Sequence, residues 1–95
     1  MSKQPVTSGT VVVAGGVLSS EIGGEHVLLN LREGTYYGLE DAGSDIWRLI
    51  QKPIAVDELC RTIVETYDVD PERCRNDVGN LLRDLADRGL VDLRA

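Results

Sequence analysis

Aromatic side chains are scarce in this chain of 95 residues, which contains no Phe, one Trp and three Tyr. Apolar residues nevertheless make up 42% of the sequence, so we expect a folded domain with a mainly aliphatic core. A chain of this length forms one domain that buries roughly 60–65% of its unfolded surface. Such a domain has little room for a deep active-site cavity.

Metal-binding and nucleophilic side chains are also few. The single histidine, His26, has no Cys or His at metal-ligand spacing, so we interpret it as a surface or edge residue of a strand. Cys60 and Cys74 lie on apolar helical stripes, which favours core packing over catalysis, with a disulfide between them as the less favoured alternative. The acidic residues are scattered, and no glycine-rich phosphate-binding motif is present. We therefore predict no catalytic residue, no metal, no cofactor and no enzymatic activity.

Positive charge is in deficit, with 10 Lys and Arg against 16 Asp and Glu and a net charge of −6. A domain that grips nucleic acid or an anionic membrane normally shows a basic face, so neither is an expected partner. The N-terminal segment has no apolar run long enough for a signal peptide or a membrane-spanning helix. We expect a cytoplasmic protein.

The first half of the chain follows the two-residue period of strands. Residues 17–22, 25–32 and 35–39 are expected as strands, joined by turns at Gly23-Gly24 and Glu33-Gly34. In the middle strand, Val27, Leu29 and Leu31 share one face. These segments predict a three-stranded antiparallel meander. Residues 1–15 are expected to form a flexible arm before a single domain at 16–95, with a short strand at residues 11–13 as an alternative.

The second half follows the period of helices. Asp41 is expected to cap a helix that runs through Ile50, and a second helix runs from Val56 to Tyr67 after Ala55, which has no side-chain acceptor for a cap. The run Asp70-Pro71-Glu72 is a strong start for a third helix, which ends at Arg88-Gly89. Residues 90–93 return as a short strand or pack on the core. The order predicts an α+β, winged helix-turn-helix-like fold in which a three-stranded antiparallel sheet precedes three helices.

The third helix has two interpretations. Between residues 72 and 88 it carries four Arg and four acidic residues, which is a poor face for DNA phosphates. Because Leu81 and Leu85 are assigned to its core stripe, Val78 and Leu82 are expected on a shoulder beside the short Tyr-rich strand. An edge strand next to such a shoulder forms a groove in which an extended peptide adds as a strand. Alternatively, the chain's own tail at residues 90–93 fills that groove.

Three segments together resemble the PqqD-like family of precursor-peptide recognition elements: residues 27–39, residues 43–50 and residues 77–91. The resemblance covers about residues 17–93. It implies a winged-helix-like domain that binds the leader region of a ribosomally made peptide by strand addition. Carried onto this sequence, it implies the following peptide-binding residues: Thr35, Tyr36, Tyr37, Gly38 and Leu39 on the strand, and Arg75, Val78, Gly79, Leu82 and Arg83 on the third helix.

Within that family, the segment from Arg32 to Trp47 is most similar to stand-alone recognition proteins of lasso peptide clusters. This similarity implies two partner enzymes, a cysteine-protease-like leader peptidase and an ATP-dependent macrolactam cyclase. The pyrroloquinoline quinone branch of the family implies a radical SAM partner instead. Ala55 departs from the Ser or Thr cap that family members often carry. The competing hypotheses are a DNA-binding winged-helix regulator and a subunit with a purely structural role.

Overall fold

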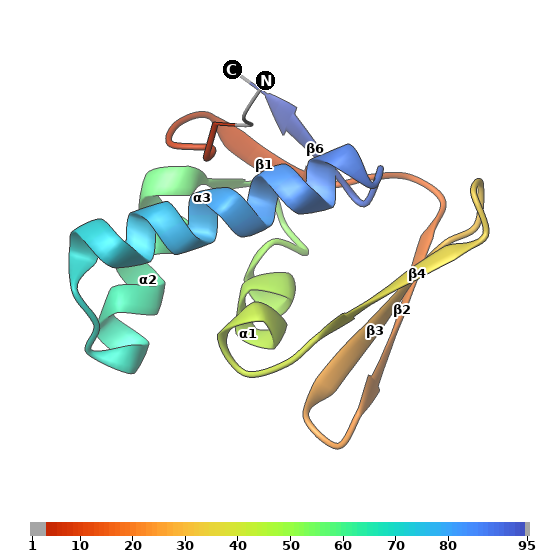
Figure 1. The fold of residues 1–95 in the computed structure, drawn as a ribbon, viewed down its shortest axis with the longest axis horizontal. Coiled ribbons are helices and arrows are strands. Elements are labelled where there is room, and N and C mark those ends of the chain that lie inside the picture. Colours follow the sequence, from red (N-terminus) through yellow and green to blue (C-terminus); the bar gives the residue numbers. More distant parts are fainter. Residues whose placement is uncertain (1–3, 95) are drawn as a thin grey trace.

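The computed structural model describes residues 4–94, in which a twisted sheet extends from a helical body (Figure 1). The elements follow the order β1 (Thr10–Val13), β2 (Val17–Ile22), β3 (Glu25–Asn30), β4 (Thr35–Leu39), α1 (Ala42–Leu49), β5 (Ile54–Ala55), α2 (Val56–Tyr67), α3 (Pro71–Asp87) and β6 (Val91–Arg94). The predicted α+β class is confirmed. Among the described helices, none is long and apolar enough to cross a membrane.

The predicted meander is confirmed as an antiparallel sheet in the order β2-β3-β4. Gly23 and Gly24 have φ values of 60° and 86°, which suits the tight turn between β2 and β3. In the second turn, the Asn30 side chain accepts hydrogen bonds from the backbone N–H groups of Arg32 and Glu33 at 3.0 and 3.3 Å. This turn leads into β4, which lies at one edge of the sheet.

The inner face of the sheet carries His26, Leu28 and Asn30, all buried against the helices. The interpretation of His26 as a surface residue is therefore wrong. Its Nδ1 is hydrogen-bonded to Ser44 Oγ on α1, and its Nε2 lies 3.4 Å from the Glu21 carboxylate. These partners satisfy the imidazole, which allows a polar ring to be buried at the junction of sheet and helix.

The outer face of the sheet exposes apolar side chains. Leu18 of β2 is paired with Leu29 of β3, which in turn is paired with Tyr36 of β4. Paired residues point to the same face, so these three side chains form a row across all three strands. Leu18 is 56% exposed and Tyr36 is 76% exposed, so the row faces outward from the body of the domain.

A second sheet, in the order β5-β1-β6, was not predicted. β1 is its central strand, and Val11 is fully buried. Val6, further toward the N-terminus, is 6% exposed. The described part of the segment expected as a flexible arm is therefore packed, because its apolar residues supply core side chains; residues 1–3 lie outside the described residues.

The same sheet shows where the C-terminal tail lies. Val91–Arg94 pairs with β1 and not with β4, so the tail forms a strand from residue 91 onward and does not fill a groove beside β4. Leu90 and Val91 at the start of this segment are buried in the core.

The helix ends largely follow the predictions. Asp70 caps α3 by accepting a hydrogen bond from the Arg73 N–H at 2.9 Å. At its other end, Gly89 has a φ of 71° and the Leu90 N–H donates to the Leu85 carbonyl at 2.9 Å, which is a Schellman motif. Ala55 precedes α2 without a side-chain cap, as expected, whereas Asp41 occupies the cap position of α1 without a side-chain cap hydrogen bond.

Candidate functional site

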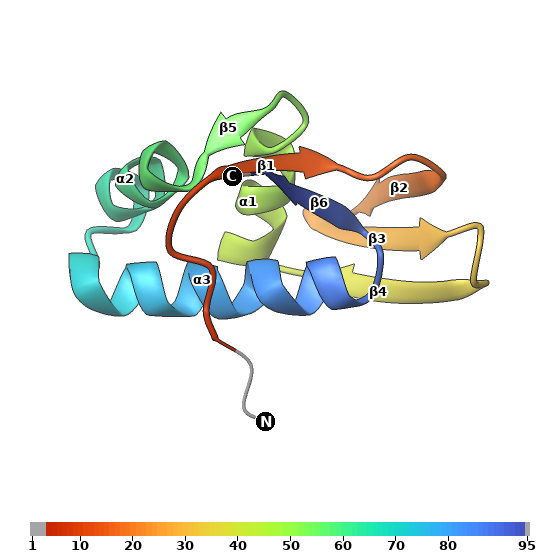
Figure 2. The ribbon, with the colours of Figure 1, turned by 90° about the horizontal axis from the view of Figure 1, so that it is seen from above.

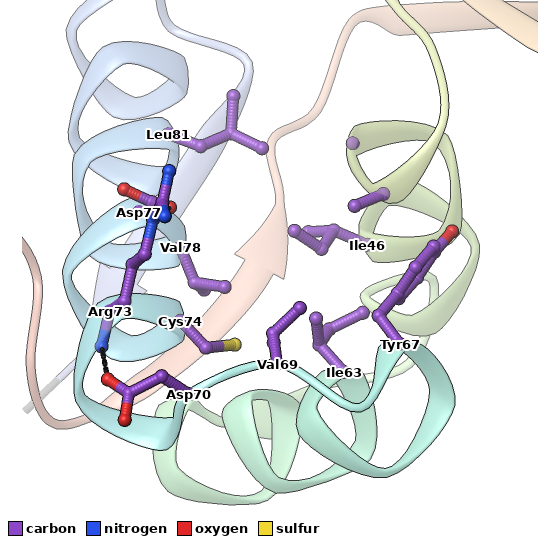
Figure 3. Close-up of a pocket in the computed structure, with 12 residues that line it drawn as sticks. Ile46, Ile63, Tyr67, Val69, Asp70, Arg73, Cys74, Asp77, Val78 and Leu81 are labelled. Atoms are coloured by element: carbon purple, nitrogen blue, oxygen red, sulfur yellow. Dashed lines mark hydrogen bonds and ion pairs between the residues drawn. The ribbon is translucent and has the colours of Figure 1, made fainter.

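An open groove of about 630 Å³ lies between α3 on one side and α1 and the end of α2 on the other. Its floor is apolar and comes from all three helices, with Ile46 from α1, Ile63 from α2, and Val78 and Leu81 from α3 (Figure 3). Charged residues of α3 and its cap form one rim, namely Asp70, Arg73 and Asp77. An apolar floor with a charged rim suits a peptide side chain better than a small charged substrate.

Gly43 lies between the last residue of β4 and the groove. A Cβ built on Gly43 would lie 3.2 Å from a methyl group of Leu39, the last residue of β4, and 3.9 Å from a methyl group of Leu81. Gly43 is itself a lining residue of the groove. Gly43 therefore packs between Leu39, which is 5% exposed, and Leu81 of the groove, so the end of β4 lies next to the groove.

β4 has a free edge, because among the described strands it pairs only with β3. A free edge presents backbone N–H and C=O groups that another extended chain can pair with. The five residues of β4 span about 16 Å at roughly 3.3 Å per residue, so only a short segment can pair.

Side chains from β4 and α3 fix the distance between the strand and the helix. The Tyr37 hydroxyl donates a hydrogen bond to Asp84 Oδ2 at 2.7 Å, and the Arg88 guanidinium lies 4.9 Å from the centre of the Tyr37 ring. Burial raises the pKa of Tyr37, and the hydrogen bond to Asp84 raises it further. The phenol therefore remains a protonated donor. The contacts of Tyr37 with Asp84 and Arg88 hold β4 at a fixed distance from α3.

The structure separates the residues expected to bind peptide into two groups. Thr35–Leu39 form the edge strand as expected, and Val78 lines the groove. Arg75 instead lines a separate depression beside α2 together with Asp57 and Pro71. Gly79 and Arg83 contact the N-terminal segment, through a hydrogen bond from Val6 to the Gly79 carbonyl and one from Arg83 to the Gln4 carbonyl.

The position assigned to Leu82 is wrong. Leu82 is fully buried and belongs to the core stripe with Cys74, Val78 and Leu85. Leu81, which was assigned to the core stripe, is only half-buried and faces the groove. The two leucines exchange roles because the apolar spacing of α3 fits either of two adjacent stripes.

Several residues of the groove were missed, chiefly Arg73, Asp77 and Leu81 of α3. Their spacing of four residues places them on one helical stripe, so this stripe could have been identified from the sequence. Ile46 and Tyr67 were missed because their approach to α3 depends on tertiary packing. Within residues 4–94, no group of His, Cys, Asp and Glu is arranged to hold a metal ion.

Cys60 and Cys74 are buried and unbonded, which confirms the prediction of core packing. The Cys74 thiol lies 3.8 Å from the Cys60 carbonyl. Burial raises the pKa of both thiols, so each is held as a protonated apolar group.

Comparison with known proteins identifies the family. Residues 25–91 match the family model described as Coenzyme PQQ synthesis protein D. The chain belongs to the PqqD family. None of the curated proteins matches the chain.

Solved structures agree with this membership. The protein of "TbiB1 in Complex with the TbiA(beta) Leader Peptide" is 36% identical, with a TM-score of 0.82, and the match covers 88% of this chain and 98% of that one. Two more distant structures share the fold. The first is "Lasso peptide synthetase B1 complexed with the leader peptide", which is 18% identical with a TM-score of 0.77, and the match covers 86% of this chain and 96% of that one. The second is the PqqD truncation of Methylobacterium extorquens PqqCD, a stand-alone recognition element, which is 22% identical with a TM-score of 0.72, and the match covers 87% of this chain and 88% of that one.

Proposed function

We propose that this PqqD-family domain binds the leader region of a ribosomally synthesised precursor peptide by strand addition. The observation that carries the proposal is the free edge of β4, which is linked through the Tyr37–Asp84 hydrogen bond to α3, the helix that lines the apolar groove. Backbone pairing with β4 supplies affinity, and the groove selects the side chains of the leader. A 36% identical relative with the same fold is a protein described in complex with a leader peptide, which supports the proposal.

The leader contacts the edge of β4 and the groove beside it. Thr35–Leu39 pair with the leader backbone, and the groove formed with Ile46, Val78 and Leu81 receives apolar leader side chains. Arg75, Gly79, Leu82 and Arg83 are not in this set, because they lie away from the groove or in the core.

The process served by this domain is lasso peptide biosynthesis, with a cysteine-protease-like leader peptidase and an ATP-dependent macrolactam cyclase as partners. The domain presents the leader and does not itself catalyse. The outer row of Leu18, Leu29 and Tyr36 offers a partner enzyme an apolar surface next to the edge where the leader adds. Contiguous exposed apolar side chains of this kind mark protein interaction sites.

The proposal is tested by titration calorimetry with two synthetic leaders, that of the precursor encoded beside this chain and the TbiA(beta) leader. We expect saturable one-to-one binding to at least the first leader. Because backbone donors of a strand alternate in direction, N-methylation along the paired segment should weaken binding at every second amide. A scan without this alternation would show that the peptide binds in another way, and no binding of the first leader would refute the function.

Catalysis by the domain alone is tested separately. A precursor peptide incubated with the pure domain should remain intact, and should lose its leader only when the peptidase is added. Cleavage that copurifies with the domain through successive columns would contradict the assignment as a non-catalytic adaptor.

A further inference from the structure

The N-terminal segment Gln4–Gly9, here called the arm, crosses the middle of α3 (Figure 2). The Val6 N–H donates a hydrogen bond to the Gly79 carbonyl at 3.0 Å, and Arg83 Nε donates to the Gln4 carbonyl at 3.2 Å. The Val6 side chain is 6% exposed and belongs to the core. The arm is therefore held on α3 by one backbone–backbone hydrogen bond, by one hydrogen bond from the Arg83 side chain, and by the buried side chain of Val6.

The arm and the groove lie on opposite sides of the same helix. At 3.6 residues per turn, Gly79 is rotated by about 200° from Asp77, which lines the groove. The core stripe, which includes Leu82, separates these two sides. The arm therefore lies outside the groove. Its Pro5 and Thr7 line a neighbouring depression with Asp70 and Arg73 of the groove rim, whereas Val6 and Gly79 act on the groove through α3.

Gly79 makes the crossing possible. A Cβ at this position would lie 2.5 Å from the Val6 carbonyl oxygen and 2.9 Å from Pro5 Cβ. The first of these contacts is with backbone, so it cannot be relieved by a side-chain rotation. Glycine in the interior of a helix is unfavourable relative to alanine, and here it is needed for the close approach of the arm.

The arm also connects α3 to the rest of the domain. The Gly9 carbonyl accepts a hydrogen bond from the Val56 N–H at the start of α2, at 2.9 Å. The next residue, Thr10, begins the central strand of the second sheet. The arm thus braces α3, one wall of the groove, against α2 and the second sheet.

We propose that the arm positions α3 as a wall of the leader groove, so that arm docking and leader binding are thermodynamically coupled. This inference rests on the proposed function. Val6 and Gly79 are positioning residues: they set the groove without touching the leader. Because coupling between two binding events is reciprocal, leader binding must also hold the arm more tightly on α3.

The first measurement uses the wild-type chain and the leader peptide that binds in the titration above. The Val6 amide is hydrogen-bonded to Gly79, so its hydrogen exchange reports release of the arm. Saturation with leader should slow this exchange by roughly fivefold or more, the lower end of typical coupling.

The second measurement compares leader affinity in full-length variants. Gly79→Ala displaces the arm, and we expect leader affinity to fall by about the factor by which leader slows exchange at Val6. Asn80→Ala, at the adjacent exposed position of α3, is the matched control and should leave affinity unchanged. Val6→Ser should weaken leader binding, and combining it with Gly79→Ala should add little, because both act through the arm.

The outcomes distinguish this inference from the proposed function. A wild-type chain that binds no leader overturns both. If the wild type binds but Val6 exchange is unchanged, or if folded Gly79→Ala keeps its affinity within about twofold, the arm is not coupled to the site. If circular dichroism shows that Gly79→Ala is unfolded, the wild-type exchange measurement alone decides.

Discussion

Leu81 and Leu82 are neighbours in α3, yet one faces the groove and the other the core. We expect Leu81→Glu to weaken leader binding by at least about tenfold, or about 1.4 kcal/mol, with little change in stability, because a charge would replace an apolar contact of the leader. Leu82→Ala should instead lower the free energy of unfolding by about 2–5 kcal/mol. Calorimetry measures the leader affinity of both variants, and chemical denaturation measures their stability. A large stability loss in Leu81→Glu together with a binding loss in stable Leu82→Ala would show that Leu82, and not Leu81, faces the groove.

The buried thiols predict a dependence of stability on pH. Burial is the main cause that raises the pKa of Cys60 and Cys74 above the ordinary value of 9.0. The charge of Asp77 raises the pKa of Cys74 further, whereas Arg75 partly opposes the rise at Cys60. The folded state therefore favours the protonated thiols, and this contribution is fully present below the unfolded pKa and is lost as pH rises through the folded one.

We accordingly expect the thermal midpoint to fall as pH rises above about 9, and to fall less in the Cys60→Ala/Cys74→Ala variant. Differential scanning fluorimetry across that range measures the difference between the two proteins. If the thermal midpoint falls equally with pH in the wild type and the variant, the thiols do not contribute to the pH dependence of stability.

At the residue scale, the sequence predicted a residue's role correctly where its local pattern is compatible with only one structural role. Asp70 and Gly89 were identified as helix ends because few residue types satisfy those backbone groups. It failed for His26, since a polar residue in a strand gives no sign of the Ser44 and Glu21 partners that make burial tolerable.

At the scale of single elements, α2 begins without a side-chain cap. Ala55 has φ −68° and ψ 141°, the extended conformation of a cap residue, but offers no acceptor to the first turn. Ala55→Ser should therefore raise the free energy of unfolding by about 0.5–2 kcal/mol. Ala55→Val is the matched control because it suits β5 but provides no acceptor, and an equal gain in both variants on urea unfolding would exclude capping as the cause.

The bounds of α2, α3, β2 and β4 followed from periodicity and turn residues. The middle strand was expected to reach Arg32, but β3 ends at Asn30 because the Asn30 side chain accepts the hydrogen bonds of the turn. The second sheet did not follow from periodicity, because β5 has only two residues and β1 pairs with segments far along the chain. Local pattern identifies a strand only when it is long enough to alternate, and it contains no information on distant pairing. The face of α3 that meets the groove was misassigned for a related reason, since it depends on where α1 and α2 lie.

At the scale of the whole molecule, leader binding and enzyme docking are predicted to use different surfaces. Leu18 and Ile22 on β2 are 56% and 65% exposed and lie two strands away from the edge of β4. We expect Leu18→Ser/Ile22→Ser to keep leader affinity but to lower leader removal by the peptidase by roughly tenfold at subsaturating domain, because about 1.4 kcal/mol of apolar contact is lost.

Ser20→Ala, on the same face of the same strand, is the control and should leave processing unchanged. The measurement is the rate of leader removal as a function of domain concentration, alongside a leader titration of each variant. Parallel loss of leader affinity and processing would mean that the outer face does not act separately from the leader site.

The pairing of β1 with β6 has a consequence for how the chain emerges from the ribosome. Thr10 pairs with Arg94, and Val13 pairs with Val91, so the partners of one strand are synthesised about eighty residues apart. Until the last strand is made, the valines of β1 have only the two residues of β5 to pair with, and an unpaired strand edge invites association with other chains. Contacts so distant in sequence also slow folding, because the loop must close before the pairing contributes any stability. Nascent chains halted before residue 91 should therefore be the aggregation-prone species during expression.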